Sequence, residues 1–420
     1  MPAFDLITGT LQGQVPSKID VLLAVGMVCT LALALLFSLG DILVLTVGAS
    51  LNIPYVFDHY RHLLVLLSLI PLAGASLMLL GANAFTLGRG LLLSATLMGV
   101  ILLFTRASDI RPRTSIHALF QPKFVSVADT FLGPADMVVG VVVGAEARAY
   151  PLKMMTWHHV INDTVGTIPM MITFCPLCNS GVAFSRLVDE QRLTFEVGTL
   201  TRKNLVMSDR ETGTWWQQLT GEAVQGPLLG KRLSLLPVEQ TTWEEWRMLH
   251  PNTHVLSPDT GYAFDYSHYP SGRRSLLRFP TNQRTRFRDG RLPERETVLG
   301  VTLNNIAKAY PFAVLSQKLV INDVFGSTAL VIFFNGKTRH GSAFERTVNG
   351  KSLSFAITAD AENSWPLYVD TETNTRWNVD GQAVEGPLTG YQLRRFATVW
   401  SFWFAWGDFH PDTLVYSGGD

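Results

Sequence analysis

The feature that most limits how this chain can fold is an internal repeat of about 160 residues. The segment that begins at Gly140 matches the segment that begins at Gly300 without a gap, through a shared Ala-Tyr-Pro triplet and a shared Val-Ile-Asn-Asp quartet. Both segments end with a pair of tryptophans followed by His-Pro. Self-similarity at a fixed spacing is the sequence signature of a structural unit that is used more than once. We therefore predict a tandem duplication, with a first repeat over residues 106–270 and a second over residues 298–420.

Each repeat has the pattern of a β-rich α+β domain. Short alternating runs such as 170–174 and 181–184 are bounded by Gly, Pro, Asn and Asp, which predicts strands separated by turns. The pair Asn162-Asp163 predicts one of these turns. One helix is predicted in each repeat, and in the first repeat it covers 241–249 with a threonine as its cap.

Residues 1–105 are apolar enough to lie in a membrane. Three stretches, 21–39, 63–80 and 85–104, approach the roughly 20 apolar residues that a bilayer core requires. The first continues past Asp41, which we expect near the membrane surface or against another helix, because a carboxylate in lipid is costly. Three such stretches exclude a single cleaved signal peptide. The sequence therefore predicts N-terminal transmembrane helices and a multi-pass cell-membrane protein, with the lipid bilayer as a partner.

The charges of the chain exclude one class of partner and mark out one segment. The 34 basic and 34 acidic residues leave no net charge, whereas nucleic-acid binding requires a basic surface, so we expect no nucleic-acid partner. The linker predicted between the repeats, 271–297, is rich in arginine. It is interpreted as a solvated loop, or else as a segment that contacts anionic lipid headgroups.

The two repeats differ at the residues that could carry chemistry. Cys29 lies in the first apolar stretch, whereas Cys175 and Cys178 form a Cys-Pro-Leu-Cys motif in the first repeat. The second repeat keeps the neighbouring Phe, Gly and Arg residues and lacks both thiols. Residues that are reactive in only one repeat are the first candidates for function. With the second-repeat residue in parentheses, they are Cys175 (Asn335), Cys178 (Thr338), His158 (Lys318), His159 (Leu319) and Met207 (Tyr368).

These residue types point to a metal site. Two thiolates at Cys-x-x-Cys spacing can bind one ion, and soft sulfur ligands select zinc, Cu(I) or iron–sulfur centres. A single pair cannot complete a four-cysteine site, so His158, then His159, then Met207 are the further candidate ligands. Met207 would favour Cu(I). The sequence predicts a membrane-anchored protein that binds copper or zinc, and leaves open whether the chemistry is redox.

Other interpretations of the cysteines stay open. Thioredoxin-like chemistry requires the pair at a helix N-terminus, whereas this motif lies between two predicted strands. A structural cysteine pair would make the chain a non-catalytic, membrane-anchored module that binds a small molecule or a protein. No Ser/His/Asp order, phosphate loop or zinc-protease helix occurs, so no catalytic residue is assigned. His250 and His410 recur in both repeats and are interpreted as structural.

The first repeat contains a series of short motifs: RAYPL at 148–152, Trp-His at 157–158, VIND at 160–163, FCPLC at 174–178, F-x-R at 184–186, and the stretches 209–218, 221–230 and 242–251. Through these motifs it resembles the domain of unknown function 3179, a microbial family for which no activity can be carried over. One departure is His159, where the family pattern has glutamate. The second repeat resembles the same scaffold without the cysteines.

The resemblance also bears on which side of the membrane the repeats occupy. Members of this family resemble exported or membrane-tethered proteins, which implies that the C-terminal domains lie outside the cytoplasm. The basic residues that follow the third apolar stretch predict the opposite side by the positive-inside rule. Because the charge difference is small, we expect the extracytoplasmic side.

Overall fold

The computed structural model of the protein describes residues 17–47, 51–109, 116–267, 289–358 and 368–418. The chain divides into two compact units, Met1–Arg111 and Pro112–Asp420. Most of the arginine-rich linker predicted at 271–297 lies outside the described residues.

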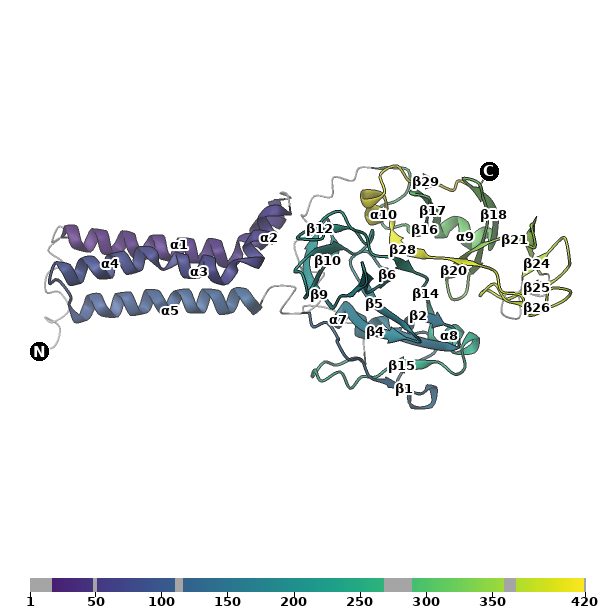
Figure 1. The fold of residues 1–420 in the computed structure, drawn as a ribbon, viewed down its shortest axis with the longest axis horizontal. Helices are drawn as coiled ribbons and strands as arrows, with labels where there is room; N and C mark the ends of the chain where they lie inside the picture. The colour runs from purple at the N-terminus through teal and green to yellow at the C-terminus, as the bar shows by residue number, and fades with distance from the viewer. Residues whose placement is uncertain (1–16, 48–50, 110–115, 268–288, 359–367, 419–420) are drawn as a thin grey trace, which may run out of the picture. The chain divides into compact units, whose positions relative to one another are not determined.

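The N-terminal unit consists of helices that lie side by side (Figure 1), and many of their apolar side chains are exposed. Val28, Leu66 and Leu77 are 66%, 64% and 68% exposed, and such exposed apolar surface indicates contact with lipid or protein rather than water. Three segments are long and apolar enough to cross a membrane, as the sequence predicted: Lys18–Leu39, Arg61–Gly81 and Leu87–Ala107. The helices of this unit are α1 (Lys18–Val47), α2 (Asn52–His59), α3 (Arg61–Ser68), α4 (Ile70–Gly81) and α5 (Leu87–Asp109).

The second unit is rich in β-strands, and we divide its described residues into a first half, 116–267, and a second half, 289–418. The first half contains β1 (Phe124–Val125), η1 (Val127–Asp129), β2 (Met137–Val143), β3 (Glu146–Pro151), α7 (Leu152–His158), β4 (Val160–Val165), β5 (Ile168–Cys175), β6 (Ser180–Ser185), β7 (Leu187–Val188), β8 (Gln191–Arg192), β9 (Phe195–Thr201), β10 (Asn204–Asp209), β11 (Trp215–Gln217), β12 (Ala223–Gln225), β13 (Leu235–Leu236), β14 (Glu239–Thr242), α8 (Trp243–Leu249) and β15 (His254–Leu256).

The second half has a similar series of elements. It contains β16 (Thr297–Leu303), β17 (Ile306–Pro311), α9 (Phe312–Lys318), β18 (Val320–Phe325), β19 (Thr328–Asn335), β20 (His340–Glu345), β21 (Thr347–Val348), β22 (Lys351–Ser352), β23 (Phe355–Ile357), β24 (Tyr368–Asp370), β25 (Arg376–Trp377), β26 (Ala383–Glu385), β27 (Arg395–Phe396), β28 (Thr398–Phe402), α10 (Trp403–Phe409) and β29 (Leu414–Val415).

The sheets of the two halves have corresponding strand orders. The first half has sheets β1-β15-β3-β2-β14, β13-β6-β5-β4 and β12-β11-β10-β9, and the second half has β29-β17-β16-β28, β27-β20-β19-β18 and β26-β25-β24-β23. Neighbouring strands run antiparallel, except that β15 is parallel to β3 and β29 is parallel to β17. The protein is therefore a set of apolar helices followed by a β-rich domain with many sheets.

Helix α8 is held on its sheet by a close approach between a tryptophan and a glycine. The predicted threonine cap is Thr242, whose side chain accepts a hydrogen bond from the Glu245 N–H. Trp246 packs on Gly140, where an added Cβ would lie 2.0 Å from the indole ring. In the second half, Gly300 has the same relation to Trp406. This contact explains why glycine and tryptophan recur together in the sequence.

Two local predictions were wrong. Asn162 and Asp163 lie inside β4 and not in a turn, because both side chains bond to other segments. The Asn162 amide exchanges hydrogen bonds with the backbone of Phe195, and the Tyr150 hydroxyl donates to Asp163. In addition, each half has a second short helix, α7 in the first and α9 in the second, where only one had been predicted.

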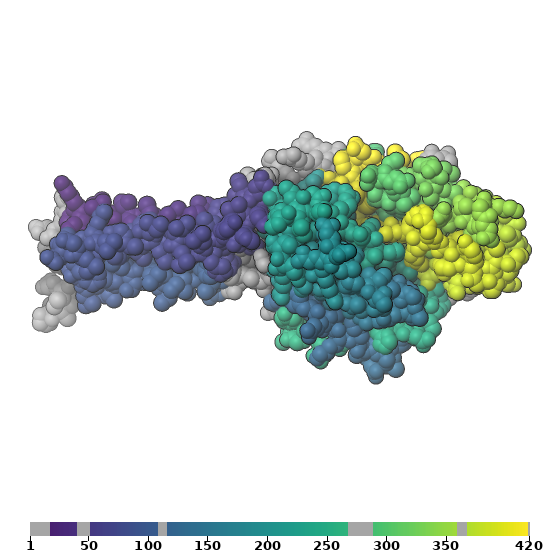
Figure 2. All heavy atoms as spheres, viewed as in Figure 1, coloured from purple at the N-terminus to yellow at the C-terminus, as the bar shows by residue number. Residues whose placement is uncertain are grey.

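The two halves pack against each other along β6, β14, β20 and β28, a contact surface that we call the seam. β14 lies beside β20, and β28 lies beside β6. The Phe402 N–H donates to the carbonyl oxygen of Cys178 over 2.8 Å, and Arg202 forms an ion pair with Asp408 at 2.7 Å. Figure 2 shows the teal atoms of the first half in direct contact with the green and yellow atoms of the second half.

Candidate functional site

The Cys-Pro-Leu-Cys motif forms a tight turn between two neighbouring strands, as predicted. Cys175 is the last residue of β5, and Ser180 begins β6. The Cys178 N–H donates to the Cys175 carbonyl oxygen over 3.2 Å, and this turn brings the two sulfur atoms within 3.7 Å of each other. Both side chains are buried, with exposures of 1% and 0%.

Polar groups of the β9–β10 connection surround the sulfurs. The Cys178 thiol donates to the Lys203 carbonyl oxygen over 3.0 Å. The Asn204 side-chain amide donates both to Cys178 Sγ over 3.4 Å and to Gln218 Oε1 over 2.8 Å. A strand end from outside the turn therefore supplies donors and an acceptor to an otherwise apolar site.

The two thiols differ in acidity. Burial raises the pKa of Cys175, but its hydrogen bond with the Cys178 side chain and the hydrogen bonds from the N–H groups of Cys178, Leu205 and Leu177 outweigh it and leave the pKa lowered. Burial and the neighbouring Cys175 raise the pKa of Cys178 well above its usual value. Cys175 is therefore the thiol that loses its proton first, and only the thiolate is a good metal ligand or nucleophile.

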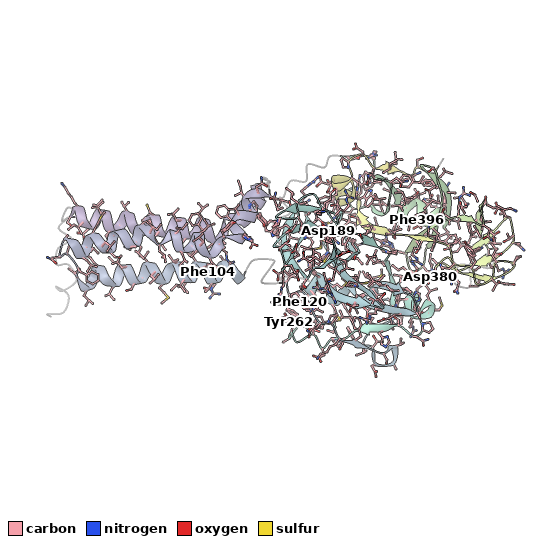
Figure 3. All side chains as sticks on the ribbon, viewed as in Figure 1. Phe104, Phe120, Asp189, Tyr262, Asp380 and Phe396 are labelled. Atoms are coloured by element: carbon pink, nitrogen blue, oxygen red, sulfur yellow. The ribbon has the colours of Figure 1, made fainter. Side chains whose placement is uncertain are left out.

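His158 lies at the end of α7 with both ring nitrogens engaged. Its Nδ1 is 2.7 Å from the His117 carbonyl oxygen, and its Nε2 is 2.6 Å from the Tyr266 hydroxyl. Its ring also packs on Tyr262, which Figure 3 labels, and on Phe264. Burial lowers the pKa of His158 to about 4, so the ring is neutral, donates from Nδ1 and accepts at Nε2.

His159 is the less engaged of the two histidines. It is 3% exposed, and its Nδ1 is buried without a hydrogen-bond partner. Burial, with a smaller contribution from His158, lowers its pKa to about 3. Its carbonyl oxygen accepts from the N–H of Phe174 over 3.0 Å, so its backbone lies opposite the residue that precedes Cys175.

The structure brings some of the predicted site residues together. Cys175, Cys178 and Met207 belong to one buried apolar cluster. Among the described residues, neither cysteine belongs to a group of three or more His, Cys, Asp or Glu ligand atoms within 4.8 Å of one another. The cysteine pair is thus assembled without a histidine in contact distance for a shared ion.

The separation of the sulfurs suits a chelate. A tetrahedral ion with metal–sulfur bonds of ~2.3 Å separates two sulfur ligands by about 3.8 Å, close to the 3.7 Å found here. The pair can therefore bind one ion with little movement. It could also form a disulfide, whose sulfurs are only about 2.05 Å apart, after the two side chains approach each other.

The sequence analysis missed a second group of polar residues. Ligand atoms of Glu239, His340 and Asp380 all lie within 4.8 Å of one another at the seam. The signal was present in the repeat, because Glu239 and His340 match the non-ligating residues Val399 and Ser180. It was overlooked because only residues reactive in the first repeat were sought, while this group draws on both.

Comparison with known proteins identifies a family and no individual relative. We find no match to the chain among curated proteins or among solved structures. The profile of one family, described as Protein of unknown function (DUF3179), matches residues 113–413. This match covers both halves of the β-rich domain and well over half of the chain, as the motifs of the first repeat had indicated. The chain belongs to the DUF3179 family.

Proposed function

We propose that the protein is a membrane-anchored metal-binding protein in which Cys175 and Cys178 chelate one copper or zinc ion. The observation that carries the proposal is the pair of buried thiols, held 3.7 Å apart by the turn between β5 and β6. Buried thiolates favour soft ions. Copper would give the site one-electron redox chemistry, whereas zinc would not.

In this proposal the order of the further candidate ligands differs from the order predicted from the sequence. His158 would have to give up two hydrogen bonds, to His117 and Tyr266, before it could ligate. Met207 shares the apolar cluster of the cysteines. Cu(I) accepts a low coordination number, and two thiolates with a thioether or an imidazole as the third ligand suit it.

A correspondence between the halves favours His159 as that imidazole. We propose that the halves are products of a tandem duplication, which their corresponding strand orders support. Leu319 occupies the position of His159, and both residues have a positive φ, 57° and 53°. The Leu319 side chain lies 3.5 Å from a Cβ built on Gly336, which matches Pro176 of the cysteine turn. The same direction would aim His159 at the turn.

The proposal includes the anchor and its orientation. The segments Lys18–Leu39, Arg61–Gly81 and Leu87–Ala107 would each cross the bilayer. Three crossings place the two ends of the chain on opposite sides. We propose the extracytoplasmic side for the β-rich domain.

A second candidate function is a non-catalytic binding module whose cysteine turn is a structural joint. The Phe402 N–H of the second half donates to the Cys178 carbonyl oxygen. Beside it, the Arg202 guanidinium forms an ion pair with Asp408. On this account the turn fastens the halves to each other, and the module binds a small molecule or protein elsewhere.

Titration of the full chain in detergent with Cu(I), against a competing chelator, distinguishes the two functions. The metal site predicts one tightly bound Cu(I) in the wild type and its loss in Cys175→Ser/Cys178→Ser. Cys29→Ser is the matched control, because it removes the only other cysteine, and it should bind as the wild type does. Equal Cu(I) binding by all three proteins, or none by any of them, would sink the proposal.

A further inference from the structure

A buried group of acidic residues and histidine lies at the seam, separate from the cysteine turn. Glu239 comes from β14, His340 from the start of β20 and Asp380 from the turn before β26. One ligand atom of each lies within 4.8 Å of the other two. His340 is fully buried and Glu239 is 6% exposed. Asp380 is labelled in Figure 3, beside β14 and β20.

Arg395 orients the two carboxylates. Its Nη1 is 2.5 Å from Glu239 Oε1, and its Nη2 is 2.6 Å from Asp380 Oδ1. The second oxygen of each carboxylate faces a histidine, and Asp380 Oδ2 lies 3.3 Å from His250 Nε2. Glu239 Oε2 is buried and makes no hydrogen bond. It lies 3.3 Å from His340 Nε2, and two ligands on a tetrahedral ion with bonds of ~2.1 Å would lie about 3.4 Å apart.

Glu245 contacts the ring nitrogen of His340 that does not face Glu239. Its Oε2 lies 3.2 Å from His340 Nδ1, the nitrogen on the far side of the ring. Glu245 in turn accepts hydrogen bonds from Asn335 over 2.7 Å and from Thr338 over 2.5 Å. A carboxylate behind the second nitrogen of a histidine is the usual support of a metal-ligating imidazole. Ser342 Oγ, 3.1 Å from Nε2, is the group that an ion would replace.

The charges at the seam match one divalent cation. Glu239, Glu245 and Asp380 bring three carboxylates, and Arg395 brings one guanidinium. Burial alone would lower the pKa of His340, but Glu245 and Glu239 raise it to about 10, so the ring carries a proton and one negative charge of the group stays uncompensated. Buried charges require a counter-charge. A divalent ion at His340 Nε2 would displace that proton, and its two positive charges would balance the two negative charges that then remain.

A cavity gives access to this group. It has a volume of ≈ 390 Å³, and its walls include Glu239, Asp380, Arg395 and His250. His250 Nε2 is buried without a hydrogen bond and lies 3.3 Å from Asp380 Oδ2. A metal with three protein ligands and an open position toward a cavity has the coordination of catalytic zinc sites.

We propose that Glu239, His340 and Asp380 bind one divalent transition-metal ion of the zinc, manganese or iron(II) class, with an open coordination position toward the cavity. Mixed imidazole and carboxylate ligands select these ions over Cu(I). The site takes ligands from both halves, and it is independent of the cysteine pair. A small molecule with an oxygen donor could enter the cavity and bind the open position.

Co²⁺ is the probe, used on full-chain Cys175→Ser/Cys178→Ser protein so that no thiolate of the turn contributes. We expect one bound Co²⁺ with visible d–d absorption and without the near-ultraviolet thiolate charge-transfer band. Glu239→Val and His340→Ser each introduce the residue found at the matching position of the other half, Val399 and Ser180 respectively. Each should weaken Co²⁺ binding by tenfold or more.

Two further variants keep the test decisive. Glu245→Gln should weaken binding by about 10–100-fold through the support of His340. Glu244→Gln, a change at the exposed neighbour of Glu245, should leave binding unaltered. If Glu239→Val or His340→Ser fails to fold, Asp380→Asn at the cavity wall takes its place. Absence of Co²⁺ binding in the cysteine-free protein would overturn the proposal, as would equal affinity in the ligand variants.

Discussion

At the scale of single residues, the comparison between repeats predicted part of the chemistry. It selected Cys175 and Cys178 because the second repeat has Asn335 and Thr338 in their places, and the structure holds both sulfurs together. It could not predict that His158 bonds to His117 and Tyr266, since those partners lie outside the repeated motifs. Side-chain pairing across distant segments is set by packing, which the sequence does not display.

His159 should make stability depend on pH. Its folded pKa is about 3 because of burial, whereas an unfolded histidine has a pKa near 6.5. The unfolded chain therefore binds more protons below about pH 6.5, and stability falls as the pH drops from about 6.5 toward 3. In metal-free protein, His159→Leu, which copies Leu319, should reduce this slope by up to about 1.4 kcal/mol per pH unit.

The measurement is the free energy of unfolding from denaturant titrations between pH 7 and 4. His158, with a pKa of about 4, contributes equally to the pH dependence of the unfolding free energy in both proteins. Its contribution is therefore the internal reference. The same pH dependence in His159→Leu and wild type would show that His159 is not buried as a neutral ring.

At the scale of elements, long or strongly patterned segments were predicted and weakly patterned ones were not. Apolar length predicted the three helical segments that are long enough to cross a membrane, and a capping threonine predicted helix α8. Helix α7 is as short as α8 and was missed because it follows Pro151 directly and has no side-chain cap. Asn162 resembled a turn residue, yet its amide pairs with Phe195 inside a sheet. A polar residue that is typical of turns can lie inside a strand when a neighbouring strand satisfies its hydrogen bonds.

The three proposed membrane crossings make a topological prediction. A reporter enzyme that is active only outside the cytoplasm should be active when fused to the C-terminus of the full chain. Deletion of Leu87–Ala107 leaves two crossings, so the same fusion should become inactive. Activity in the deletion and none in the full chain would place the β-rich domain in the cytoplasm, as the basic residues after the third segment suggest.

At the scale of the whole molecule, the two halves meet at the seam through two different sets of polar contacts, one around the cysteine turn and one around His340. Around the cysteine turn, Phe402 bonds to Cys178 and Arg202 pairs with Asp408. Around His340, the first half contributes Glu239 and Glu245. The repeat predicted two similar domains, but not that residues of both halves would meet around Cys178 and around His340. That arrangement depends on how the halves dock.

X-ray absorption at the copper edge shows directly whether the cysteine turn binds a soft metal through its two sulfur atoms. The sample is full-chain protein loaded with Cu(I) without oxygen, with Cys175→Ser/Cys178→Ser as the reference. We predict two sulfur atoms in the first coordination shell of the wild type and none from cysteine in the variant. A wild-type shell of nitrogen and oxygen alone would contradict the account.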